Sequence, residues 1–142
     1  MELLTDNEFN WLTKHHPGLT YMPSARMIAG RFDVHAQFNN MASITDDFEL
    51  LIKLHFGNTF PSVYETGGKI RRMAKMLNLP MSELHVNYDD TLCLIRPDKI
   101  KTYYPNGLNI KDFMRHLESH LYWVSYFYQY GMAPWEAEKH GW

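Results

Sequence analysis

The amino-acid sequence predicts an α+β fold in which an antiparallel meander sheet is backed by an N-terminal helix and a long C-terminal helix. Three features predict it: a capped helical segment near the start, runs of alternating apolar and polar residues in the middle, and a helical repeat near the end. Alternation with one polar face is typical of antiparallel strands. The 142 residues fit one domain, which we place over residues 1–142.

The first predicted element is a short helix over residues 6–16. Thr5 and Glu8 have the spacing of a capping box, in which each side chain satisfies a backbone N–H at the start of a helix. Pro17 and Gly18 follow the segment, and this pair is typical of a helix end.

Two alternating runs follow and predict neighbouring strands. One face of the first run carries Ile28, Gly30, Phe32, Val34, Ala36 and Phe38. One face of the second carries Phe48, Leu50, Ile52, Leu54 and Phe56. We expect residues 39–47 to connect these strands and a third, shorter strand to run from Pro61 to Tyr64.

Helical spacing returns in the second half of the chain. Ile70, Met73 and Leu77 fit a helix within residues 69–79, although the same stretch also fits an irregular loop. The clearest helical signal runs from residue 110 to 127, where apolar residues recur at every third or fourth position. Asn109 can cap this helix and Gly131 can end it, and a short tail helix is expected over residues 134–139.

Composition excludes several classes of protein. The net charge is −2 and no long basic run occurs, so a nucleic-acid-binding surface is not expected. No stretch approaches the roughly 18 apolar residues of a membrane span, and the first residues lack the pattern of a secretory signal. The single cysteine rules out an internal disulfide and suits a reducing compartment. We therefore expect a cytoplasmic protein without a cofactor.

The stretch richest in chemically active side chains is residues 85–94. It places an imidazole, a carboxamide and two carboxylates close to the only thiol, in the order His85, Asn87, Asp89, Asp90 and Cys93. A thiolate is a strong nucleophile, and a nearby imidazole or amide can assist its attack or hold an oxyanion. The alternative is a structural cysteine, because free cysteines are among the most buried residues and leucines flank this one.

A metal site is a rival interpretation. His116 and His120 share a face of the last predicted helix, and with Cys93 or His85 they could form a zinc site of mixed ligands. No cysteine pair and no His-Glu-x-x-His pattern supports such a site. We therefore expect no metal.

The cysteine segment resembles the active site of a known family. His85-x-Asn87, the acidic pair and Leu92-Cys93-Leu94 are similar to the segment of ubiquitin-conjugating enzymes that reads His-Pro-Asn, a short spacer, then an apolar residue, Cys and Leu. The resemblance is closer to the bacterial branch found in CBASS antiphage operons. In that branch a segment similar to residues 63–70 precedes the cysteine, glycine often stands at the position of Asp90, and the tail resembles residues 135–141.

This resemblance implies a ubiquitin-conjugating-like fold and a transferase of that type. Cys93 would take up the C-terminal carboxyl group of a partner protein as a thioester and pass it to an amine. The implied partner is a cGAS/DncV-like nucleotidyltransferase, with or without a separate activating enzyme. A second hypothesis is an inactive adaptor of the same fold that only binds partners, and the presence of Cys93 favours the enzyme.

The residues around Cys93 suggest a division of roles. We expect His85 and Asn87 to shape the loop and polarise the thioester carbonyl. Asp89 or Asp90 is expected to serve the acceptor amine as a general base. The flanking leucines and the acidic pair would raise the pKa of the thiol, so a strongly depressed value is not expected.

Overall fold

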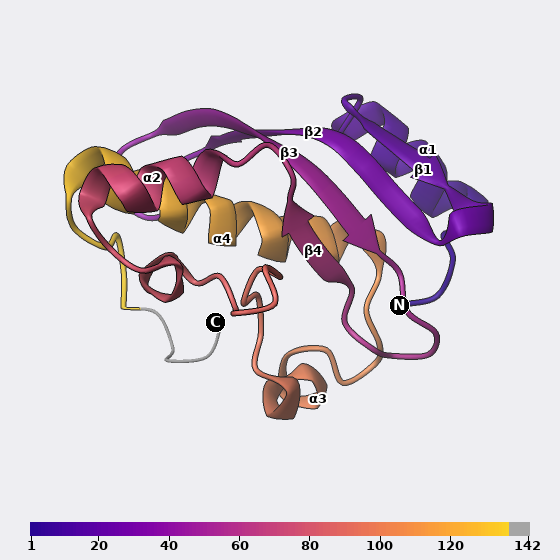
Figure 1. Ribbon diagram of the computed structural model, residues 1–142. Coiled ribbons are helices and arrows are strands. Elements are labelled where there is room, and N and C mark those ends of the chain that lie inside the picture. Colours follow the sequence, from indigo (N-terminus) through magenta and orange to yellow (C-terminus); the bar gives the residue numbers. More distant parts are fainter. Residues whose placement is uncertain (137–142) are drawn as a thin grey trace.

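The computed structural model describes residues 1–136, which form a four-stranded antiparallel sheet with helices around it (Figure 1). The strands follow one another in chain order, and their bounds are β1 (Leu19–Met22), β2 (Met27–Ala36), β3 (Ile44–Lys53) and β4 (Ser62–Glu65). Each strand pairs with the next in the antiparallel sense. The predicted α+β class and the antiparallel meander are confirmed.

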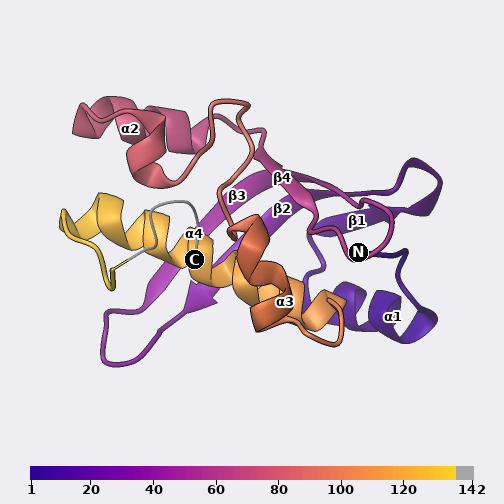
Figure 2. The same ribbon diagram turned by 90° about the horizontal axis from the view of Figure 1, so that it is seen from below.

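The helices lie at both ends of the sheet and across one of its faces. Their bounds are α1 (Asp6–His15), α2 (Lys69–Leu77), α3 (Ile100–Tyr103) and α4 (Ile110–Tyr130). The long helix α4 runs across β2 and β3, with α1 at the end near β1 and α2 at the opposite end (Figure 2). Short 3₁₀ turns occur at η1 (Pro23–Ala25), η2 (Met81–Leu84) and η3 (Pro97–Lys99). None of the helices within residues 1–136 has the length and apolar character needed to cross a membrane.

The capping box of α1 forms as predicted and also fixes α4. The backbone N–H of Glu8 donates to the Thr5 hydroxyl, and the N–H of Thr5 donates to the Glu8 carboxylate, both at 3.1 Å. The other carboxylate oxygen of Glu8 accepts the backbone N–H of Ile110 at 2.9 Å. One side chain therefore satisfies N–H groups at the starts of two helices, which are otherwise without partners.

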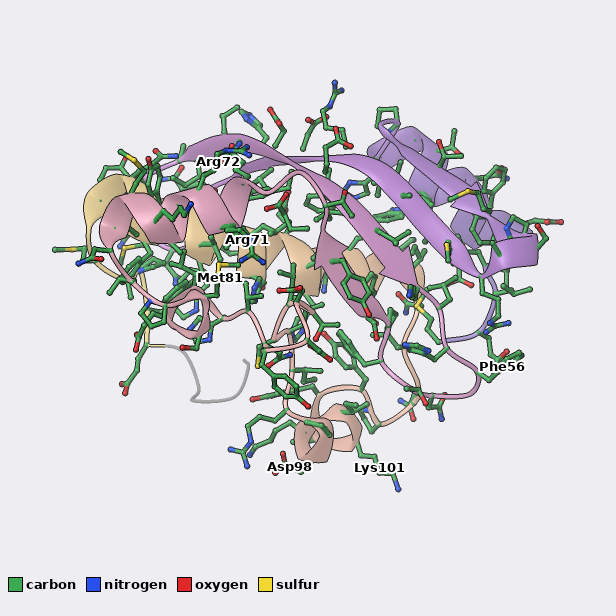
Figure 3. The ribbon with its side chains drawn as sticks, viewed as in Figure 1. Phe56, Arg71, Arg72, Met81, Asp98 and Lys101 are labelled. Atoms are coloured by element: carbon green, nitrogen blue, oxygen red, sulfur yellow. The ribbon has the colours of Figure 1, made fainter. Side chains whose placement is uncertain are left out.

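The hydrophobic core lies between α4 and the inner face of the sheet. Six of the buried residues of the two long strands are alternating ones predicted from the sequence, namely Ile28, Phe32, Val34, Phe48, Leu50 and Ile52, and Ile44 of β3 is buried as well. They belong to one buried cluster with Phe113, Leu117 and Leu121 of α4. The alternation fails at Phe56, which is 74% exposed because β3 ends at Lys53 and the chain turns away. Figure 3 shows Phe56 at the far end of the sheet.

The sheet differs from the prediction at two points. The short strand β1 was not predicted, and β3 begins at Ile44, inside the stretch expected to be a loop. The pairing of β1 with β2 brings Gly18 against Gly30, whose φ is +132°. A Cβ atom on Gly30 would lie 2.3 Å from the carbonyl oxygen of Gly18, so only glycine fits there.

The ambiguous segment after β4 folds as helix α2. It buries Ile70, Met73 and Ala74, and Glu65 accepts the backbone N–H of Ile70 at 2.7 Å. The tail was predicted to be helical from residue 134 to 139. Residues 134 and 135 form a bend and residue 136 has no regular structure, and the remaining positions lie outside the described residues.

Candidate functional site

The cysteine segment forms a tight hairpin. The backbone N–H of Cys93 donates to the carbonyl of His85, and the N–H of Asn87 donates to the carbonyl of Thr91, both at 2.8 Å. At the tip, the N–H of Asp90 donates to the carbonyl of Asn87 at 3.0 Å. Asp90 has a φ of +70°, a left-handed conformation that aspartate tolerates better than most residues other than glycine. This is the position at which the resembled branch often has glycine.

The hairpin is joined to the edge of the sheet. The backbone N–H of Leu92 donates to the carbonyl of Val63 in β4 at 2.8 Å, and Thr91 forms a bridge with Tyr64. Val86, Leu92 and Leu94 are buried in the core. Local pairing and burial therefore give Cys93 a fixed place beside β4.

Cys93 opens into a groove with a volume of about 240 Å³. Asn87 and Thr91 of the hairpin line the same groove, as do Ser62 of β4 and Ile100 of α3. Asp98 and Lys101 in Figure 3 mark the η3–α3 segment that borders it. The structure thus brings together two of the residues predicted for the site, the thiol and the carboxamide.

The thiol of Cys93 is half-buried. Burial raises its pKa because the thiolate loses solvation. At neutral pH the sulfur is therefore mainly protonated. This agrees with the expectation drawn from the flanking leucines.

The amide of Asn87 is held in place by a short chain of hydrogen bonds. Its Nδ2 donates to the Thr91 hydroxyl at 3.0 Å, and that hydroxyl donates to Oδ1 of Asp89. An amide nitrogen carries two hydrogens, so Asn87 retains a second donor. The arrangement can present one N–H to a carbonyl group held in the groove.

The two carboxylates of the hairpin have other contacts. Asp89 accepts the hydroxyl and the backbone N–H of Thr91, and these bonds lower the pKa of its carboxyl group. Asp90 lies 3.3 Å from Nη2 of Arg71 and lines a different groove, of about 310 Å³. Arg71 and Met81, which also line that second groove, are neighbours in Figure 3. Neither Asp89 nor Asp90 lines the groove of Cys93.

The ring of His85 packs against α4. Its centroid lies 4.6 Å from the Trp123 ring and 6.2 Å from the His120 ring. Burial lowers the pKa of His85. The backbone carbonyl of His85 accepts the N–H of Cys93, and the His85 side chain does not line the cysteine groove.

The histidines of the zinc hypothesis have separate environments. Nε2 of His116 lies 2.6 Å from the carbonyl oxygen of Leu94, and Nδ1 lies 2.8 Å from the Tyr104 hydroxyl. A carbonyl only accepts, so Nε2 carries the hydrogen and Nδ1 accepts from Tyr104. His120 is fully buried. Within residues 1–136, no group of three or more His, Cys, Asp or Glu side chains is placed to hold a metal ion.

The structure adds one pair of polar residues that the sequence did not single out. Ser62 lines the cysteine groove, and its hydroxyl lies 2.7 Å from Nε2 of His55. Both residues precede Cys93 by about one quarter of the chain, and neither belongs to a recognisable motif. Only the pairing of β4 with the hairpin brings Ser62 to the groove of Cys93, and His55 is bonded to Ser62.

Comparison of the chain with protein-family models, with curated proteins and with solved structures found no match.

Proposed function

We propose that this protein is an acyltransferase of the ubiquitin-conjugating type, with a ubiquitin-conjugating-like fold, that carries an acyl group as a thioester on Cys93. The observation that carries the proposal is the groove in which the thiol lies beside the tethered amide of Asn87. The order of elements supports it: a helix, an antiparallel meander of four strands, a cysteine hairpin and a long C-terminal helix. The resemblance of the cysteine segment implies the same order.

The first step is acyl transfer to sulfur. Cys93 loses its proton to solvent, and the sulfur attacks the activated carboxyl carbon of the donor. A C–S bond forms and the activating group leaves with its electron pair. The free N–H of Asn87 stabilises the negative charge that develops on the carbonyl oxygen. His85 and Asp89 support this step indirectly, because their hydrogen bonds hold Cys93 and Thr91 in the hairpin.

The raised pKa of Cys93 fits a carrier better than a permanently ionised nucleophile. A thiol of low pKa oxidises readily and attacks less strongly for a given thiolate fraction. From the resemblance, the proposed donor is the C-terminal carboxyl group of a cGAS/DncV-like nucleotidyltransferase in the cytoplasm, and the proposed setting is antiphage defence. The acceptor is an amine.

The test uses a synthetic peptide that carries a C-terminal mercaptoethanesulfonate thioester. Incubation with the protein should give an adduct on Cys93 that is seen by intact-mass analysis and cleaved by hydroxylamine. Cys93→Ala should give no adduct, and Cys93→Ser should form an oxyester more slowly. The control is the same chain unfolded in urea, whose thiol has an ordinary pKa.

The comparison between folded and unfolded chain separates the enzyme from the adaptor. If the protein is an adaptor without an acyl-binding site, its half-buried thiol of raised pKa should react more slowly than the thiol of the unfolded chain, because less of it is thiolate. A site that binds the acyl group should react about tenfold faster or more. Slower loading of the folded protein would contradict the proposal and favour the adaptor.

A further inference from the structure

The hydroxyl of Ser62 and the imidazole of His55 form a pair at the cysteine groove. Ser62 Oγ lies 2.7 Å from His55 Nε2, and Ser62 lines the groove whereas His55 does not. The two residues are held by the sheet, because His55 follows β3 and Ser62 begins β4. A hydroxyl bonded to an imidazole is a group through which a proton can pass.

The backbone fixes this pair relative to the thiol. The residue after Ser62 is Val63, whose carbonyl accepts the N–H of Leu92, the residue before Cys93. This hydrogen bond of 2.8 Å and the bridge between Tyr64 and Thr91 join the strand of Ser62 to the hairpin segment that carries Cys93. Ser62 and Cys93 cannot change their separation much without breaking the attachment of the hairpin to the sheet.

The groove itself offers no other base. Every described residue that lines it is uncharged, and none of them is an aspartate, a glutamate or a histidine. Of the two carboxylates that the sequence suggested for this role, Asp89 and Asp90, Asp90 pairs with Arg71 at the other groove. Three bases contact residues of the groove: His55 contacts the Ser62 hydroxyl, Asp89 the Thr91 hydroxyl and His116 the Leu94 carbonyl. The bonds from Thr91 lower the pKa of Asp89, which makes it a weak base. Both ring nitrogens of His116 already have partners, so His55 is the base best placed to take up a proton through a groove side chain.

We propose that Ser62 and His55 form a proton relay that serves the amine acceptor when it attacks the thioester on Cys93. This inference rests on the proposed function and adds to it the route of the proton and the class of acceptor. The acceptor is a primary amine that enters the uncharged groove in its neutral form. Ser62 contacts the amine, and His55 acts through Ser62.

The bonds of the transfer balance without a further reactant. The amine nitrogen attacks the thioester carbon, an N–C bond forms, and the C–S bond breaks with its electron pair on sulfur. The nitrogen gives one proton to Ser62 Oγ as Ser62 gives its own to His55 Nε2. The imidazolium then releases its proton by way of solvent, and the Cys93 thiolate takes one up. The products are an amide and the free thiol.

The test is single-turnover discharge of protein that has been loaded on Cys93 with the thioester peptide and freed of excess peptide. The acceptor is Nα-acetyl-lysine, varied in concentration, and loss of the adduct is followed by intact-mass analysis. Ser62→Ala and His55→Gln should load within about twofold of wild type. Their maximal discharge rates should fall about 10²-fold with little change in half-saturation by the amine, as expected for lost general-base help.

The chain offers a matched control. His35 and Thr45 form another imidazole–hydroxyl pair, 3.0 Å apart on the exposed face of β2 and β3. His35→Gln and Thr45→Ala should discharge at the wild-type rate. Added imidazole should restore His55→Ala at least tenfold, because a small base can enter the space left by the ring, and a purely structural histidine would show no such rescue.

The outcomes separate the two proposals. Normal loading of Ser62→Ala with wild-type discharge would overturn the relay and leave the thioester carrier intact. Failure of imidazole to rescue His55→Ala would also overturn the relay, and that arm remains decisive if Ser62→Ala folds poorly. Failure of the wild-type protein to load would overturn the proposed function together with the relay.

Discussion

His116 Nε2 lies 2.6 Å from the carbonyl oxygen of Leu94, the residue that follows Cys93. On the other side of the cysteine, the N–H of Leu92 is bonded to Val63 of β4. The thiol is therefore carried by a segment tied to the sheet on one side and to helix α4 on the other. This double attachment gives the half-buried Cys93 the fixed position that a reacting group needs.

The bond between His116 and Leu94 should matter for stability as well as for the site. His116→Phe leaves the carbonyl of the buried Leu94 and the hydroxyl of the half-buried Tyr104 without their partner, and an unsatisfied buried group such as the Leu94 carbonyl costs about 1–3 kcal/mol. We expect the free energy of unfolding to fall by at least this much and peptide loading of Cys93 to slow. Urea unfolding followed by circular dichroism measures the first effect. His116→Gln can still donate to Leu94, so equal losses in the two variants would contradict this role.

Stability should decrease as the pH falls below about 6.5. Burial lowers the pKa of His16, His85, His116 and His120 from the model-peptide value of 6.5. The unfolded chain then binds more protons than the folded one, and each such proton contributes about 1.4 kcal/mol per pH unit. The stabilisation is complete above pH 6.5 and is lost as the pH falls toward the folded-state values. Urea midpoints at pH 7.5, 6.5 and 5.5 test this, and equal midpoints would refute it.

The amide of Asn87 should affect loading more than the carboxylates of the hairpin. Asn87→Ala removes an amide donor that lines the groove, and we expect the loading rate to fall about tenfold to a hundredfold. Asp89→Asn combined with Asp90→Asn should change loading and discharge by less than about threefold, because neither carboxylate lines the groove. Loading and discharge with the thioester peptide measure both effects. A hundredfold slower discharge in the double variant would return the acidic pair to the mechanism in place of Ser62.

Gly30 should be one of the least replaceable residues of the sheet. Its φ of +132° is accessible mainly to glycine, and an added Cβ would meet the Gly18 carbonyl at 2.3 Å. Gly30→Ala should therefore lower the free energy of unfolding by about 2–4 kcal/mol. Gly57→Ala is the control, because Gly57 also has a positive φ, +68°, but no atom lies within 4 Å of its Cβ position. That variant should lose only about 1 kcal/mol, and equal losses would show that the contact with Gly18 is unimportant.

Local sequence signals predicted the elements that depend on neighbours along the chain. The capping box of Thr5 and Glu8, the cap at Asn109 and the left-handed end at Gly131 all occur in the structure as expected. The alternation of β2 and β3 also predicted the buried residues of these strands except Ile44, which was assigned to a loop. Such signals are readable because helix caps and strand faces depend on a few consecutive residues.

Local sequence signals were not sufficient to predict strand β1 and helix α2. β1 has only four residues, too few to show an alternation, and it exists because it pairs with β2. Residues 69–77 form a helix in which Ile70 and Met73 are buried in the core, and this burial decides between the helix and the loop that the sequence also allowed. Pairing and burial are long-range effects, so the sequence left both segments undecided.

The candidate site divides in the same way. The sequence by itself determined that one thiol is flanked by leucines and preceded by His85 and Asn87. Only the tertiary structure decided that Asn87 shares a groove with Cys93, that the His85 ring packs against Trp123, and that Ser62, which is bonded to His55, lines the same groove. The physical reason is that the side chains of a hairpin point to two different faces. The hydrogen bonds that attach the hairpin to β4 and α4 determine which residues each face contacts.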